Sequence, residues 1–258
     1  MKFFGILGAL DPEMLAIQAV LNKHGHQWAS ARYNGFRVKT HQAYSASTVN
    51  VAELPKDAFL ISVECKVNGI EPDAKVDHHR PGDAGYGVDA SKFLQGSSLG
   101  QVLRILELEP TEEHRYLAAA DHCLTAAYAG QCPGIDPDKL RQIRRQCKVR
   151  MRNIAPETWE EQVAAAKAVL LNAPKIQFGD CELAWFDETQ GDMLVPELSE
   201  ASAQLGQPYV AIRSQNLEGR VKAAIKSADP QTVKLWMNRC GLKDLYGCPE
   251  RGFAGGYF

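Results

Sequence analysis

Short apolar runs alternate, over the first eighty residues, with a segment whose apolar positions recur every three or four residues. Residues 2–7 are apolar and predict a first strand. Pro12 then begins a predicted helix that ends at Gly25, with Asp11 as its N-cap. Further strands are expected at residues 32–40, with a turn at Asn34-Gly35, at 59–64 and at 74–79. This alternation predicts an α/β fold.

The middle of the chain reads as helices and the end as a separate unit. Helices are expected from Gly96 onward and at residues 112–129, 136–152 and 156–172. Ala173-Pro174 then breaks the chain. Strands at 182–186, 209–214 and 220–227 and helices at 196–205 and 230–240 follow. We therefore expect a first domain at 1–155, a connector helix at 156–174, and a second, smaller α/β domain at 175–258.

The composition excludes several classes of protein. The net charge of −2 gives no general attraction to nucleic acid or membrane, so an anionic ligand needs a local basic patch. The seven cysteines are odd in number and form no CxxC pair, which argues against a zinc ribbon or a disulfide framework. The apolar runs are far shorter than the roughly 20 residues of a membrane span, and the start shows no signal peptide. We expect a cytoplasmic protein with no membrane partner.

Acidic and imidazole side chains follow two of the predicted strands. Glu64 ends the strand at 59–64, and Asp77-His78-His79 ends the next one. In an open α/β sheet, ligands bind at the carboxyl ends of the strands. Oxygen and nitrogen ligands there suit Mn²⁺, Mg²⁺, Fe²⁺ or Zn²⁺. The alternative is an Asp-His pair that only orders a loop. Asp11 is either a further ligand or only the helix cap.

Other polar residues have two interpretations each. The loop after the triplet is rich in glycine, and its Arg80 either meets an anion or faces solvent. Ser97 and Ser98 either cap the helix that follows or leave its first amides free for a phosphate. Asp121-His122, among alanines in a helix, is either a hydrogen-bonded pair or a ligand and acid–base pair.

The helix at 136–152 carries a stripe of basic residues. Arg141, Arg144, Arg145, Lys148 and Arg152 fall on one side of it. Such a stripe is either a solvated face or a contact for a phosphate backbone. A nucleic-acid processing factor that uses this stripe is therefore one hypothesis for function.

Taken together, these residues resemble the DHH phosphoesterase superfamily with a DHHA1-like C-terminal domain, as a divergent member. The name-giving triplet is Asp77-His78-His79, Ser97-Ser98 resembles the serine-rich helix start, and Asp121 stands where the family has its last acidic ligand. The strand that ends at Ile225-Lys226-Ser227 and the glycine-rich tail resemble the C-terminal domain of the family. The resemblance implies a doubly wound parallel sheet joined by a helix to the smaller α/β domain.

The resemblance also implies an activity and its residues. It implies a metal-dependent phosphoesterase that hydrolyses a phosphodiester or phosphoanhydride of a nucleotide or short oligonucleotide, with Mn²⁺ as the metal and Mg²⁺ as the alternative. A homodimer is one of the assemblies left open. The implied metal ligands are Asp11, Glu64, Asp77, His78 and Asp121; the catalytic residues are Asp77, His79 and His122; and the substrate-binding residues are Arg80, Ser97, Ser98, Lys226, Arg251, Gly252, Gly255 and Gly256.

The sequence departs from the family pattern at four places. Only Asp11 stands where the family has several acids after the first strand, and Glu64 replaces an aspartate. Phe253 follows Gly252 where the family has glycine-glycine-histidine, and Asp121-His122 differs from the usual Thr-Asp-Thr. These departures raise a second hypothesis, in which the same fold binds a nucleotide without cleaving it.

Overall fold

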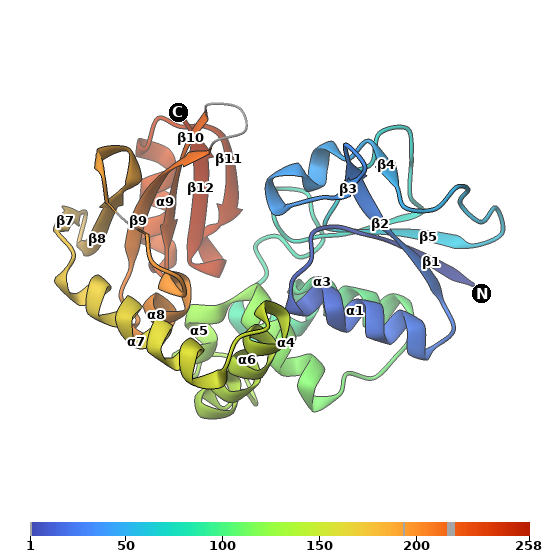
Figure 1. Ribbon diagram of the computed structural model, residues 1–258, viewed down its shortest axis with the longest axis horizontal. Coiled ribbons are helices and arrows are strands. Elements are labelled where there is room, and N and C mark those ends of the chain that lie inside the picture. Colours follow the sequence, from blue (N-terminus) through green and yellow to red (C-terminus); the bar gives the residue numbers. More distant parts are fainter. Residues whose placement is uncertain (1, 193, 216–219) are drawn as a thin grey trace. The chain divides into compact units, whose positions relative to one another are not determined.

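The computed structural model describes residues 2–192, 194–215 and 220–258 (Figure 1). The protein has a mixed α/β fold with two separate sheets. It divides into two compact units, residues 1–86 with 94–121 and residues 87–93 with 122–258. The expected ranges divide the chain elsewhere, at 155 and 174. The helices α5 (Leu124–Tyr128), α6 (Pro137–Arg152) and α7 (Pro156–Asn172) belong to the second unit, which is therefore the longer of the two.

The first unit is built on a sheet with a parallel centre. Its strands lie in the order β3-β2-β1-β5-β6, with β4 also paired to β2. β1 is parallel to both β2 and β5, and β5 is parallel to β6. β3 and β4 are antiparallel to β2. The strands are β1 (Phe3–Leu7), β2 (Gln27–Tyr33), β3 (Phe36–Arg37), β4 (Thr48–Val49), β5 (Phe59–Val63) and β6 (Ala74–Val76).

Helices and a folded connection pack on this sheet. Its helices are α1 (Pro12–Lys23), α2 (Phe93–Gly96), α3 (Ser98–Ile105) and α4 (Glu112–His122), with short 3₁₀ turns η1 (Thr40–Ser45) and η2 (Ala90–Lys92); of these, η2 and Phe93 belong to the second unit. α1 packs against α3 and β2. Ala43 and Ala46, in and after η1, join Phe4 and Ile6 of β1 in a buried apolar cluster. Phe4 and Ile6 of β1 are therefore packed against the segment around η1.

Two sequence expectations for this unit need correction. At residues 32–40 the expected turn at Asn34-Gly35 is present, and both residues have positive φ, but the strands differ. β2 begins earlier, at Gln27, and β3 covers only Phe36–Arg37. The backbone at Asn34-Gly35 suits the tight turn of a hairpin. The expected helix at 112–129 is interrupted, since Cys123 has φ −152° and ψ 58° between α4 and α5. Asp121-His122 therefore ends α4 instead of lying in the middle of a helix.

The second unit has a mixed, largely antiparallel sheet. Its strands lie in the order β11-β12-β10-β9-β8-β7, and only the β8–β9 pair is parallel within this described sheet. The strands are β7 (Lys175–Phe178), β8 (Cys181–Asp187), β9 (Tyr209–Gln215), β10 (Arg220–Lys226), β11 (Lys243–Cys248) and β12 (Phe253–Tyr257). The remaining elements are α8 (Leu198–Leu205), α9 (Pro230–Arg239), η3 (Glu188–Gln190) and η4 (Pro249–Arg251).

The glycine-rich tail is a strand and not a loop. Gly255 pairs with Ala224 of β10 and Gly256 with Ala223, so β12 lies between β10 and β11. A Cβ at Gly255 would lie 2.3 Å from the hydroxyl of Tyr246. The glycine is needed here because a neighbouring ring lies against the backbone. This packing explains the composition of the tail without a ligand.

The basic stripe of α6 is paired with acids of its own unit. Arg141 and Arg145 contact Glu160 of α7, and Arg144 contacts the buried Glu200 of α8. Arg152 contacts Glu197 at 2.5 Å. These contacts favour a structural role for the stripe, which holds α6 against α7 and α8.

Candidate metal centre

The site lies where the order of the parallel strands reverses. The chain leaves β1 for β2 on one side and reaches β5 on the other. In open α/β sheets the crevice beyond the carboxyl ends of the strands at such a point receives ligands. Glu64 follows β5 and Asp77 follows β6, so both stand at this edge.

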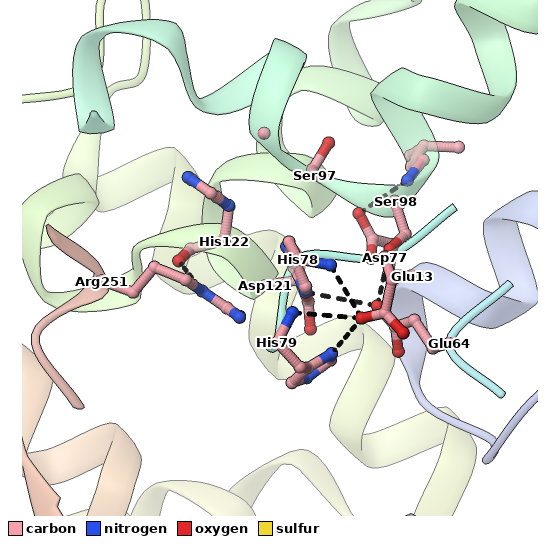
Figure 2. Close-up of polar contacts among 12 residues, drawn as sticks. Glu13, Glu64, Asp77, His78, His79, Ser97, Ser98, Asp121, His122 and Arg251 are labelled. Atoms are coloured by element: carbon pink, nitrogen blue, oxygen red, sulfur yellow. Dashed lines mark hydrogen bonds and ion pairs between the residues drawn. The ribbon is translucent and has the colours of Figure 1, made fainter. Parts of the chain in front are cut away.

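Four side chains converge there from four segments. His78 Nε2 lies 3.3 Å from Glu64 Oε1 and 3.1 Å from Asp121 Oδ2 (Figure 2). Glu13, in the first turn of α1, offers a carboxylate oxygen to the same group. One ligand atom from each of Glu13, Glu64, His78 and Asp121 lies within 4.8 Å of the other three. The side chain of His78 is fully buried and that of Asp121 is 28% exposed, so solvent reaches the group at Asp121.

Glu64 is held in place by both its backbone and its side chain. Its φ of 48° is in the left-handed region, which a non-glycine residue seldom adopts without a functional reason. Its amide donates to Val76 O, which ties the ends of β5 and β6 together. The hydroxyl of Ser98 donates to Glu64 Oε1 at 2.8 Å. Glu64 is therefore oriented before any ligand arrives.

The carboxyl groups around this site raise the pKa values of their neighbours. Glu13 is 2% exposed and accepts a hydrogen bond from Leu99 N at 3.0 Å. Burial raises the pKa of Glu13 well above its usual value, and the charges of Asp121 and Glu64 raise it further. Burial and the same two charges also raise the pKa of Asp11. Several carboxyl groups are therefore close together in a largely buried place, and a bound cation would favour their charged forms.

Asp77 and His79 form a second, adjoining arrangement. Asp77 Oδ1 lies 2.8 Å from His79 Nδ1 (Figure 2) and accepts from the amides of His78 and His79. Its Oδ2 accepts from the hydroxyl of Tyr44. Burial alone would raise the pKa of Asp77, but the hydrogen bonds from His79 and Tyr44 lower it to about 2. The ionised Asp77 can only accept, so it places the His79 proton on Nδ1.

His79 also lies near two of the four candidate ligands, Glu64 and His78. One ligand atom from each of Glu64, His78 and His79 lies within 4.8 Å of the other two. Asp77 belongs to neither of the two candidate ligand groups found in the described residues. Its contacts make it the residue that orients His79.

Glu13 belongs to the candidate ligand group, whereas the expected ligand Asp11 does not. Asp11 Oδ1 accepts from Met14 N at 2.7 Å as the N-cap of α1, and its carboxylate belongs to neither candidate group in the described part of the chain. The sequence pattern missed Glu13 because an acid in the first helical turn is ordinary. The signal that could have found it is its two-residue spacing from Asp11, just after the first strand.

The hydroxyl groups of Ser97 and Ser98 form hydrogen bonds within the protein. Ser97 Oγ accepts from Gly100 N as the N-cap of α3, and Ser98 orients Glu64. Both are fully buried. Arg80, another expected substrate-binding residue, lies close to the site. Its guanidinium carbon is 3.8 Å from the centre of the ring of Tyr44, whose hydroxyl donates to Asp77.

The expected catalytic residue His122 and the remaining expected substrate residues belong to the second unit. His122 is buried, with Nε2 at 2.9 Å from Val88 O, and its carbonyl accepts from Arg251 Nε at 2.7 Å (Figure 2). These contacts serve the fold of that unit. Gly252 ends η4 with φ 72°, and Gly255 and Gly256 are part of β12. Lys226 Nζ donates to Ser199 Oγ at 2.9 Å.

No family model matches the chain, and neither does any curated protein sequence. None of the helices in the described ranges is both long and apolar enough to cross a membrane.

Proposed function

We propose that the protein is a metal-dependent phosphoesterase of the DHH type, which hydrolyses a phosphodiester or phosphoanhydride of a nucleotide or short oligonucleotide. The single observation that carries the proposal is the convergence of Glu13, Glu64, His78 and Asp121 within 4.8 Å. Three carboxylates and one imidazole from separate segments are costly to bury together without a cation.

The donor set fits a hard or borderline divalent metal. Carboxylate oxygens suit Mg²⁺ and Mn²⁺, whereas an imidazole favours Mn²⁺, Fe²⁺ or Zn²⁺ over Mg²⁺. We take Mn²⁺ as the first candidate and Mg²⁺ as the second. Ser98 supports Glu64 by a hydrogen bond, as expected for a residue behind a metal ligand.

The doubly wound arrangement of the first unit is part of the same proposal. The parallel order β2-β1-β5-β6 and the helix α1 between β1 and β2 support it. The position of Glu64 and His78 at the carboxyl ends of the strands is where such folds bind ligands.

The residues around the metal group have separate tasks in the proposed reaction. A divalent cation bound by the four side chains would supply Lewis acidity, activating water and neutralising the phosphoryl charge. Asp77 fixes the His79 ring and leaves its Nε2 to exchange a proton with substrate or water. Arg80, held against Tyr44, supplies a positive charge for a phosphoryl oxygen.

A substitution that preserves shape tests the proposal. We expect the protein to release product from a phosphodiester or a nucleotide in the presence of Mn²⁺, and the Glu64→Gln variant to lose this turnover. Glu71→Gln is the matched control, since Glu71 carries the same charge and its side chain is 86% exposed. Nucleotide binding with no turnover on diesters, monoesters and anhydrides would contradict the enzyme and favour the binding module.

A further inference from the structure

One face of the sheet in the second unit is apolar, whereas the opposite face carries basic residues of β9 and β10 beside a second apolar cluster. In β10, Val221, Ala223 and Ile225 join the apolar cluster that includes Val233 and Trp236 of α9. Strand residues alternate between faces, so Lys222 and Lys226 lie on the other side. Both faces belong to the sheet of β9, β10, β12 and β11 in Figure 1.

Three cations gather on that second face. Lys222 stands directly opposite Arg213 of β9. Lys226 lies on the same side of β10, four residues further along the strand, with Ala224 between the two lysines. Arg213 acts electrostatically on both lysines, and Lys226 also acts on Lys222. Like charges at such positions destabilise a sheet. The repulsion between Arg213, Lys222 and Lys226 therefore makes the pairing of β9 and β10 less stable.

The surroundings of the lysines do not neutralise them. Lys226 Nζ donates to Ser199 Oγ in the first turn of α8, where the helix dipole favours an anion over a cation. Lys222 Nζ lies 4.8 Å from the centre of the Tyr246 ring. Tyr209 and Tyr257 stand opposite Lys226 and Lys222 in the neighbouring strands. The nearby Asp244 of β11 contacts Arg220.

The pKa values of both lysines are lowered by burial and by the neighbouring cations. Burial and the charge of Arg213 together lower the pKa of Lys226 to about 8. Burial also lowers the pKa of Lys222 to about 8, with contributions from Lys226 and Arg213. Within the described residues, no carboxylate contributes to either shift. An anion bound between the three groups would remove this cost.

We propose that Arg213, Lys222 and Lys226 form an anion-binding site for a ligand that carries at least two phosphoryl groups. Three positive charges exceed what a single phosphate group, with about two negative charges, can balance. Arginine and lysine are the side chains that hold phosphoryl oxygens by charge-assisted hydrogen bonds. The inference deepens the proposed function and rests on it for the phosphate class of the ligand.

Calorimetric titration of the full chain with pyrophosphate in EDTA tests the site apart from the metal centre. We expect saturable binding that is tighter than binding of orthophosphate, and proton uptake at pH 8.5, because a bound anion raises the pKa of both lysines. Two buffers with different heats of ionisation report that uptake. Binding in EDTA does not depend on metal, so the two proposals can fail separately. Pyrophosphate can bind although the phosphoesterase assay shows no turnover, and turnover can occur although pyrophosphate does not bind.

Charge-removing variants identify the residues. Lys222→Met and Arg213→Gln are each expected to weaken pyrophosphate binding about tenfold or more. Lys222→Arg keeps the charge and is expected to retain binding, which separates loss of the site from loss of the fold. Lys234→Met is the matched control, since Lys234 is an exposed lysine on α9 of the same unit. Absence of saturable pyrophosphate binding would overturn the proposal, as would equal weakening by Lys234→Met and Lys222→Met.

Discussion

His78 Nε2 lies 3.1 Å from Asp121 Oδ2, which joins the loop after β6 to the last turn of α4. His78 has no exposed surface, so its ring can serve only what lies beside it. Glu64 and Glu13 complete the group from the end of β5 and the start of α1. The candidate metal centre is therefore made by tertiary structure, and its members can be tested one at a time.

The first prediction separates Glu13 from Asp11. We expect Glu13→Gln to weaken Mn²⁺ binding by about 10- to 100-fold, because it removes a charge from the ligand group. Asp11→Asn should change the affinity much less and the stability little, since asparagine caps a helix as well as aspartate. Calorimetric titration with Mn²⁺ and thermal unfolding of both variants provide the comparison. A greater loss of affinity in Asp11→Asn than in Glu13→Gln would restore Asp11 as the ligand.

The second prediction concerns the orientation of His79. Asp77→Asn removes the charge that holds the proton on His79 Nδ1, and we expect turnover to fall about 10- to 100-fold while the fold persists. Nitrogen NMR of the His79 ring should show a changed tautomer. Asp57→Asn, at an exposed turn, is the control. An unchanged tautomer and turnover would show that Asp77 does not position His79.

The third prediction uses the close approach of the loop after His79 to the site. A Cβ at Gly85 would lie 1.9 Å from Gly96 O and 2.6 Å from His78 Cβ. We expect Gly85→Ala to reduce the free energy of unfolding by about 2 kcal/mol or more and to weaken Mn²⁺ binding through a displaced His78. Urea denaturation and metal titration measure the two effects. Ala84→Ser, at the exposed neighbour, should change stability by less than about 0.5 kcal/mol.

The fourth prediction is a dependence of stability on pH. The folded-state pKa values of Lys222 and Lys226 are lowered to about 8 from an ordinary value of 10.5. Between these two values the unfolded chain binds more protons, so both lysines make the folded state more stable as pH rises from 8 to 10.5. Below pH 8 they are charged in both states and the cost of their burial is present in full.

A comparison with a variant isolates this effect from other titrating groups. Lys226→Met should be more stable than the natural chain at pH 7, by on the order of 1 kcal/mol after solvent screening, and the difference should shrink by pH 10. Urea denaturation across this range measures it. A difference that stays constant with pH would mean that Lys226 titrates normally.

Local signals predicted much of the fold. Pro156 and the break after Asn172 set the bounds of α7, and the apolar run from Phe59 set β5 within one residue. The hairpin turn at Asn34-Gly35 was readable because asparagine and glycine accept positive φ. Asp77-His78-His79 and Glu64 pointed to the edge of the sheet where the candidate ligand group lies, because parallel strands end together there.

The rest depended on contacts that the chain makes at long range. The glycine-rich tail reads as a loop, yet it pairs with β10 and β11 because Tyr246 occupies the space that side chains on Gly255 would need. The interruption at Cys123 has no glycine or proline to announce it. Glu13 looks like a residue that complements the helix dipole until α3 and α4 bring Leu99 and Asp121 to it.

The most direct test of the account is a titration of the purified protein, stripped of metal, with Mn²⁺ beside its Glu64→Gln and His78→Ala variants. We predict saturable binding by the natural chain, at least about tenfold weaker binding by each variant, and unchanged binding by Glu71→Gln. Binding of equal strength in all four proteins, or none in the natural chain, would contradict the metal centre.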